Sequence, residues 1–97
     1  MPKLAPPGIK TALATVPKWK KRGSAAIVRT YLFKDFVVAM KFVNAVANLA
    51  EKACHHPDID IRWNKVSLWL TTHDAGGLTQ KDFALAAKLD AAAGRLE

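Results

Sequence analysis

The spacing of hydrophobic residues changes several times along the chain and outlines a series of short elements. Ile9, Leu13 and Val16 follow the three-to-four spacing of a helix. Residues 25–33 are instead rich in β-branched and aromatic side chains, and residues 66–73 alternate between apolar and polar positions, as strands do. These patterns predict a helix over 8–16, paired strands over 18–21 and 25–33 with a turn at 22–24, and paired strands over 59–63 and 66–73 with a turn near 64–65.

A longer apolar segment with helical spacing lies between the two strand pairs. Asp35 fits its N-cap, because the carboxylate can accept a free N–H of the first turn, and Pro57 should end the helix at about Cys54 or His55. We expect its inward stripe to be wide enough that a second side is buried, in a subunit interface. The stripe comprises Phe36, Met40, Val43, Ala47, Ala50 and Cys54, and is widened by Val37, Val38, Val46 and Leu49.

The remaining residues complete the expected order of elements. Gly76-Gly77 reads as a loop, and Thr79 as the cap of a last helix over roughly residues 80–96. The order is therefore α-β-β-α-β-β-α. Strand pairs combined with segregated helices make an α+β fold, with a four-stranded antiparallel sheet and three helices on one face. The 97 residues fit a single domain, 1–97, in which residues 1–7 are expected to be flexible.

Positive charge is concentrated at the N-terminal end. Residues 1–29 contain seven lysines and arginines and no acid, which accounts for the whole net charge of +7. Acid-free basic segments occur in organellar presequences and in nucleic-acid-binding arms, but also as plain solvated surface, which is the interpretation we favour here. Direct nucleic-acid binding is expected to be unlikely, because aromatic and basic residues are not interleaved and no DNA-binding motif is present.

Apolar runs and cysteine content limit where the protein could act. No apolar run approaches the roughly twenty residues that span a bilayer, and no apolar signal-peptide segment follows the N-terminus. Cys54 is the one cysteine, so no intramolecular disulfide can form, and we expect it to be a buried small apolar side chain in a reducing compartment. The expected location is cytoplasmic, with no membrane partner; a mitochondrial location is the alternative that the basic N-terminus suggests.

The three histidines of the chain lie at the ends of predicted elements. His55 and His56 close the central helix before Pro57, and His73 ends the last strand. Imidazole can donate or accept a proton near neutral pH without assistance, so this placement indicates a proton-transfer site. A three-histidine zinc site is the rival interpretation. Adjacent histidines are an uncommon ligand pair and no cysteine or carboxylate stands at the usual zinc spacing, so we expect no metal.

Two carboxylates could serve these histidines. Glu51 lies one helical turn before His55 and could hydrogen-bond it, or could form an ordinary surface pair. Asp82 could reach back to the N–H of Thr79 in a capping box, or could orient a histidine from an inward-facing position. The two roles of Asp82 need not exclude each other.

Several of these residues stand in motifs that recur in a known family. The segment Glu51-Lys52-Ala53-Cys54-His55-His56-Pro57, then Asn64-Lys65-Val66, Thr72-His73 and Gly76-Gly77-Leu78-Thr79 running on to Asp82, resembles the signature of the pterin-4a-carbinolamine dehydratase family. The resemblance covers about residues 16–92. It implies a hydro-lyase (lyase) that converts 4a-hydroxytetrahydrobiopterin to quinonoid dihydropterin and water in tetrahydrobiopterin recycling, with the pterin as substrate and no cofactor.

The resemblance also implies roles for individual residues and partners. His55 and His73 would act as general acid and base, supported by Asp82, while His56 would bind and orient the ring. Glu51, His56, Trp63 and Thr72 would contact the substrate. Partners would be further copies of the chain, in a homodimer or homotetramer, and functionally an aromatic amino acid hydroxylase. A non-catalytic role as a dimerisation cofactor for a transcription factor is the alternative, but an adaptor would not need the histidines.

Overall fold

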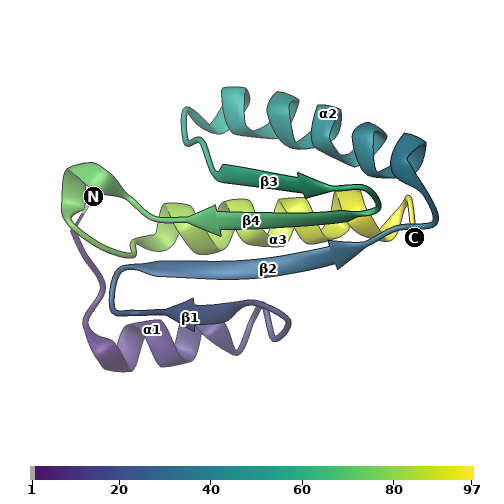
Figure 1. Ribbon diagram of the computed structural model, residues 1–97. Helices are drawn as coiled ribbons and strands as arrows, with labels where there is room; N and C mark the ends of the chain where they lie inside the picture. The colour runs from purple at the N-terminus through teal and green to yellow at the C-terminus, as the bar shows by residue number, and fades with distance from the viewer. Residues whose placement is uncertain (1) are drawn as a thin grey trace.

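The computed structural model describes residues 2–97 and contains the predicted order of elements. Two hairpins form one four-stranded antiparallel sheet, with strand order β1-β2-β4-β3. Three helices cover one face of this sheet, with α3 packed between α1 and α2 (Figure 1). The α+β fold is therefore confirmed. The elements are α1 (Pro6–Leu13), β1 (Lys20–Arg22), β2 (Ala26–Leu32), α2 (Phe36–Ala53), β3 (Asp58–Arg62), β4 (Lys65–Leu70), the short 3₁₀ helix η1 (His73–Ala75) and α3 (Gln80–Gly94).

The two central strands carry the sheet's contribution to the core. β2 and β4 pair from Ile27↔Leu70 to Leu32↔Lys65. In β4, Val66, Leu68 and Leu70 are fully buried and face the helices, as the alternation predicted, while Ser67 and Trp69 point to the other face. One face of the sheet is therefore built into the core and the other is left open.

An aromatic cluster joins β2 to α2 at the centre of the core. The ring of Tyr31 lies 4.6 Å from that of Phe42, and Phe33 lies 5.0 Å from the same Phe42 ring. All three rings are buried, and tilted aromatic pairs at such separations add to the stabilisation from burial itself.

Asp90 on α3 ties the start of the sheet to the helical layer. Its Oδ1 atom accepts hydrogen bonds from Trp19 Nε1 at 2.9 Å, Arg29 at 2.6 Å and the Tyr31 hydroxyl at 2.6 Å. Burial, and then the hydrogen bond to the Asp90 carboxylate, raise the pKa of Tyr31 well above its ordinary value. The network fixes the central strand β2 against α3.

Helix α2 begins at the predicted cap, where the Asp35 carboxylate accepts a hydrogen bond from Val38 N at 2.9 Å. Its predicted inward stripe is confirmed at Val46 and Ala50 but was wrong at its N-terminal end. The fully buried residues are Ala39, Phe42, Val46 and Ala50, whereas Phe36 is 50% and Val37 is 61% exposed. The helix is apolar on two sides, so hydrophobic spacing alone did not show which side packs on the sheet.

The N-terminal region is more ordered than the sequence indicated. Helix α1 starts at Pro6 rather than residue 8, because proline suits the first helical turn, where its missing N–H is not needed. Leu4 N donates to Leu78 O at 2.8 Å, which holds this end of the chain on the loop before α3. Met1, also expected to be flexible, lies outside the described residues. Within residues 2–97, no helix has both the length and the apolar character needed to cross a bilayer.

Candidate active site

The end of α2 sets the directions of the two adjacent histidines. Cys54 has φ 50°, in the left-handed region, and its N–H donates to the carbonyls of Ala50 and Glu51. His55 N then donates back to Ala50 O at 3.1 Å. This pair of bonds is a Schellman motif, which usually has glycine at the left-handed position. The reversal turns His55 inward, while Cys54 is exposed rather than buried as predicted.

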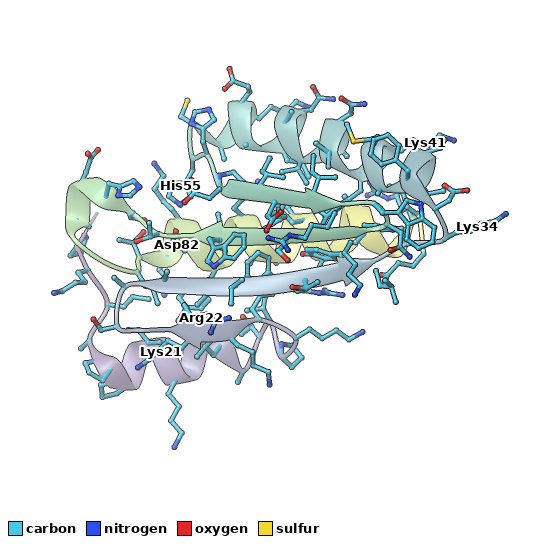
Figure 2. All side chains as sticks on the ribbon, in the orientation of Figure 1. Lys21, Arg22, Lys34, Lys41, His55 and Asp82 are labelled. Atoms are coloured by element: carbon cyan, nitrogen blue, oxygen red, sulfur yellow. The ribbon has the colours of Figure 1, made fainter. Side chains whose placement is uncertain are left out.

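His55 is held by a buried carboxylate from the other end of the chain. Its Nε2 atom lies 2.6 Å from Asp82 Oδ1, and the side chains approach each other from the end of α2 and the first turn of α3 (Figure 2). His55 is 8% exposed and Asp82 is fully buried. A buried charge is tolerated when it is paired and hydrogen-bonded, so this contact fixes both side chains.

The second oxygen of Asp82 is occupied by two further donors. Asp82 Oδ2 accepts from the Thr72 hydroxyl and from Thr79 N, each at 2.9 Å. Thr79 also caps α3, because its hydroxyl accepts from Lys81 N at 3.2 Å, and the capping box predicted for Thr79 and Asp82 is present. Asp82 thus performs both roles left open by the sequence.

The donors and acceptors in this network form one consistent chain. The Thr72 and Thr79 hydroxyl oxygens lie 2.9 Å apart. Since Thr72 donates to Asp82, Thr79 must donate to Thr72, and every neighbour then donates towards the carboxylate. With Asp82 ionised, His55 also donates, from Nε2–H. The other ring nitrogen, Nδ1, is left with its lone pair free to accept a proton.

His56 points the other way and is exposed. Its Nε2 atom lies 2.5 Å from Glu51 Oε2, with both side chains largely in solvent. The predicted Glu51–His55 pair was therefore wrong: the left-handed turn at Cys54 takes His55 inward and leaves His56 beside Glu51. An exposed pair of this kind contributes little to stability, but it limits the orientation of the His56 ring.

The third histidine reaches the same place from the sheet. Strand β4 ends at Leu70, before His73, so His73 lies in the 3₁₀ helix η1 rather than at the strand end that was predicted. Backbone hydrogen bonds between Thr72 and Gly77 close this loop, and Gly76 adopts φ 72° within it. The loop places His73 opposite the end of α2.

These segments enclose a polar hollow of about 220 Å³. Its walls bring together all three histidines and Thr72, as the sequence predicted for one site. They also include residues that the sequence analysis did not assign to a site. The lining residues are Cys54, His55, His56, Thr71, Thr72, His73 and Asp74.

Three predicted site residues stand outside the walls. Glu51 bonds His56 and does not line the hollow. Asp82 supports His55 from beneath. Trp63 is 68% exposed in the turn between β3 and β4, and Figure 1 shows this turn at the opposite end of the hairpin from η1. The geometry of one chain therefore gives no support to substrate contact by Trp63. Thr79 was predicted only as a helix cap, and the sequence held no sign of its hydroxyl contact with Thr72.

The grouping of possible ligand side chains bears on whether the site could hold a metal ion. Across residues 2–97, no three histidine, cysteine, aspartate or glutamate side chains are grouped so that they could hold a metal ion. Both nitrogen contacts that the structure gives to His55 and His56 are made to carboxylates.

Comparison with known proteins decides the family. The model of the pterin 4 alpha carbinolamine dehydratase family matches residues 2–92. This chain belongs to that family. A curated relative from Thermomicrobium roseum is 59% identical over 84% of this chain and 86% of its own length. It is named as a pterin-4-alpha-carbinolamine dehydratase, with that activity assigned provisionally. The resemblance inferred from the histidine motifs is thereby confirmed.

Two solved structures share the fold of this pterin carbinolamine dehydratase family member. A transcriptional coactivator/pterin dehydratase from Brucella melitensis is 38% identical and superposes with a TM-score of 0.91, over 95% of this chain and 99% of that one. A pterin dehydratase-like protein described as a RuBisCO assembly factor in the alpha-carboxysome is 26% identical, with a TM-score of 0.69 over 79% and 90% of the two chains. Proteins with this fold are thus also named for roles other than pterin dehydration.

Proposed function

We propose that this chain is a 4a-hydroxytetrahydrobiopterin dehydratase, which releases water from the carbinolamine and yields quinonoid dihydropterin for tetrahydrobiopterin recycling. The observation that carries the proposal is the buried Asp82–His55 pair at the wall of a hollow that two further histidines also line. A pure binding surface has no need of an imidazole whose orientation is fixed by a buried carboxylate.

The reaction needs one proton delivered and one removed. The C4a hydroxyl is a poor leaving group until it is protonated, and the N5 lone pair expels it as water. N5 then loses its own proton, which leaves the C4a=N5 double bond of the product. Histidines suit both transfers because each form of imidazole is populated near neutral pH.

The hydrogen bonds of His55 support its role as the base. Nε2–H is engaged by Asp82, so Nδ1 is the nitrogen that can take the N5 proton, and the carboxylate stabilises the positive charge that then develops on the ring. His73, on the facing loop, is the acid that protonates the leaving hydroxyl. His55 gains one proton and His73 loses one, so the net reaction releases one water. Proton exchange with solvent then returns both histidines to their starting states.

The remaining site residues would bind the substrate. His56, oriented by Glu51 at the rim, would contact the pterin ring, and Thr72 would hold the wall next to His55. No step calls for a redox or metal cofactor, since the reaction is a proton-coupled loss of water. The 4a-hydroxy substrate would come from an aromatic amino acid hydroxylase, and the cytoplasm is the proposed location.

The exposed apolar surface suggests that the enzyme acts as a homo-oligomer. Phe36 and Val37 are half or more exposed on α2, and Ile59 and Ile61 are exposed on the edge strand β3. An apolar face on a helix and an unpaired strand edge are each costly to leave in water. A second copy of the chain could cover both, in a dimer or a tetramer.

A binding role is the second candidate, because a solved relative is named as a transcriptional coactivator as well as a pterin dehydratase. The two roles are compatible if they use different surfaces. The histidine hollow favours the enzyme as the primary function.

Histidine variants test the proposed division of labour. His55→Gln keeps an N–H donor for Asp82 but no base, so the protein should fold while kcat for carbinolamine dehydration falls by about a hundred- to ten-thousand-fold. His73→Ala should also lower kcat, and the double variant should approach the spontaneous rate. His56→Ala is the matched control: it should raise KM and leave kcat nearly unchanged. Wild-type kcat in the folded double variant would place the chemistry elsewhere.

A further inference from the structure

The face of the sheet away from the helices carries a second hollow, separate from the histidine site. The strand register places Lys20, Val28 and Trp69 side by side across β1, β2 and β4. Further along the same face, the hydroxyls of Thr30 and Ser67 are 2.7 Å apart. These residues form the floor of an open hollow of about 460 Å³, none of whose lining residues belongs to the histidine site.

Positive charge surrounds this floor on two sides. Lys18, Lys20 and Arg22 line it along β1 and the segment before it, and Lys65 and Arg62 line it from the second hairpin. Asp60 lines the hollow and faces Arg62 at 3.3 Å, and the exposed Asp58 lies opposite Trp69 in the strand register. Four cations therefore remain available to an anionic ligand: Lys18, Lys20, Arg22 and Lys65. Figure 2 shows Arg22 on the edge strand β1.

Trp69 gives the floor an aromatic surface between the two groups of cations. Its side chain is partly exposed although it lies on a central strand. Arg29 also lines the hollow, but it is bonded to Asp90 at 2.6 Å and so is not one of the available cations. This juxtaposition could not be predicted from the sequence, because Trp69 and the β1 cations lie far apart along the chain and only strand pairing brings them together.

We propose that this open sheet face binds single-stranded nucleic acid, with a base stacked on Trp69 and the flanking phosphates on the β1 and β4 cations. A base–aromatic contact tolerates any sequence, because every base presents a flat face, and cations that track the backbone supply the rest of the affinity. A duplex keeps its bases stacked on each other and cannot offer one to Trp69. An acidic peptide would use the cations but gain nothing from the ring. The expectation that nucleic-acid binding is unlikely considered only residues that are neighbours in the sequence, whereas strand pairing brings Trp69 together with cations from other strands.

The test is fluorescence anisotropy of the full chain with a labelled twelve-nucleotide oligo-dT and oligo-U, over a series of salt concentrations. Binding should weaken with salt, with a slope of log K against log salt of about −3, because each of four neutralised phosphates contributes about −0.7 for single strands. Trp69→Leu should weaken binding by about fivefold or more, as loss of one stacked base does. Lys20→Gln with Lys65→Gln should reduce the magnitude of the slope by roughly 1.4.

Matched controls separate a built site from general positive charge. Lys10→Gln with Lys41→Gln removes the same charge from exposed positions on α1 and α2 and should leave the slope nearly unchanged. None of these variants should alter dehydratase kcat, and circular dichroism should show that each is folded. The proposal is overturned if the two double variants weaken binding equally, if Trp69→Leu binds as wild type does, or if a duplex or poly-glutamate of equal length binds as tightly as the single strands.

Discussion

Replacing Asp82 with asparagine should separate the carboxylate's part in catalysis from its part in folding. Asparagine has almost the same shape, but one of its two terminal atoms is a donor rather than an acceptor. Its oxygen can still serve Thr72 and Thr79, while its NH₂ group must face His55. His55 would then have to accept at Nε2 and carry its hydrogen on Nδ1, which removes the free lone pair that is proposed to act as the base.

The expected loss of stability follows from the three hydrogen bonds that Asp82 accepts. Bonds to a charged group are worth about 1 kcal/mol more than neutral ones, so Asp82→Asn should cost roughly 2–3 kcal/mol. Domains of this size are stable by about 5–15 kcal/mol, so the variant should remain folded. Its kcat should nevertheless fall by about a hundredfold or more, the usual contribution of a general base.

The same helix provides a matched control. Asp90 also accepts three hydrogen bonds, from Trp19, Arg29 and Tyr31, but lies away from the hollow. Asp90→Asn should cost a similar free energy of unfolding in a urea titration and leave kcat nearly intact. ¹⁵N NMR of the imidazole should show the His55 tautomer change in Asp82→Asn alone. The reasoning is refuted if Asp82→Asn retains wild-type kcat, or if Asp90→Asn loses as much activity.

Three further expectations concern metal, assembly and Tyr31. Dehydratase activity should survive exhaustive chelation, and activity that vanished with chelator and returned with zinc would contradict the proton-transfer mechanism. Light scattering at micromolar concentration should give the mass of a dimer or tetramer, and Phe36→Asp together with Val37→Asp should lower it; a monomeric wild type would count against the proposed interface. Tyr31 is the one tyrosine, so phenolate absorbance reports it alone. Because the folded-state pKa is raised, its contribution to stability should be complete below about pH 10 and fall as the pH rises further, and Tyr31→Phe should lack that alkaline loss.

The order of elements could be predicted from the sequence because several local signals agreed. Asp35 and Thr79 mark the starts of α2 and α3, and both accept the capping hydrogen bonds expected of them. The alternation in β4 identified its buried face. Caps and alternation act over a few residues, so the chain itself displays them.

The errors arose where distant packing or a special backbone conformation decides. Hydrophobic spacing could not choose between the two apolar sides of α2. The left-handed turn at Cys54 occurs at a residue that gives no glycine signal, so the exchange of partners between His55 and His56 was not predictable. Thr79 acquires its contact with Thr72 through the closure of the η1 loop, a tertiary event. These are the features that turn a set of motif residues into a site.

The most direct test of the proposed function is the dehydration rate of freshly generated 4a-hydroxytetrahydrobiopterin with purified, metal-free protein, compared with His55→Gln at equal concentration. The proposed mechanism predicts that the wild type accelerates loss of water well above the spontaneous rate, and that folded His55→Gln loses most of that acceleration. A wild-type protein that leaves the spontaneous rate unchanged, or a His55→Gln variant as active as the wild type, would contradict it.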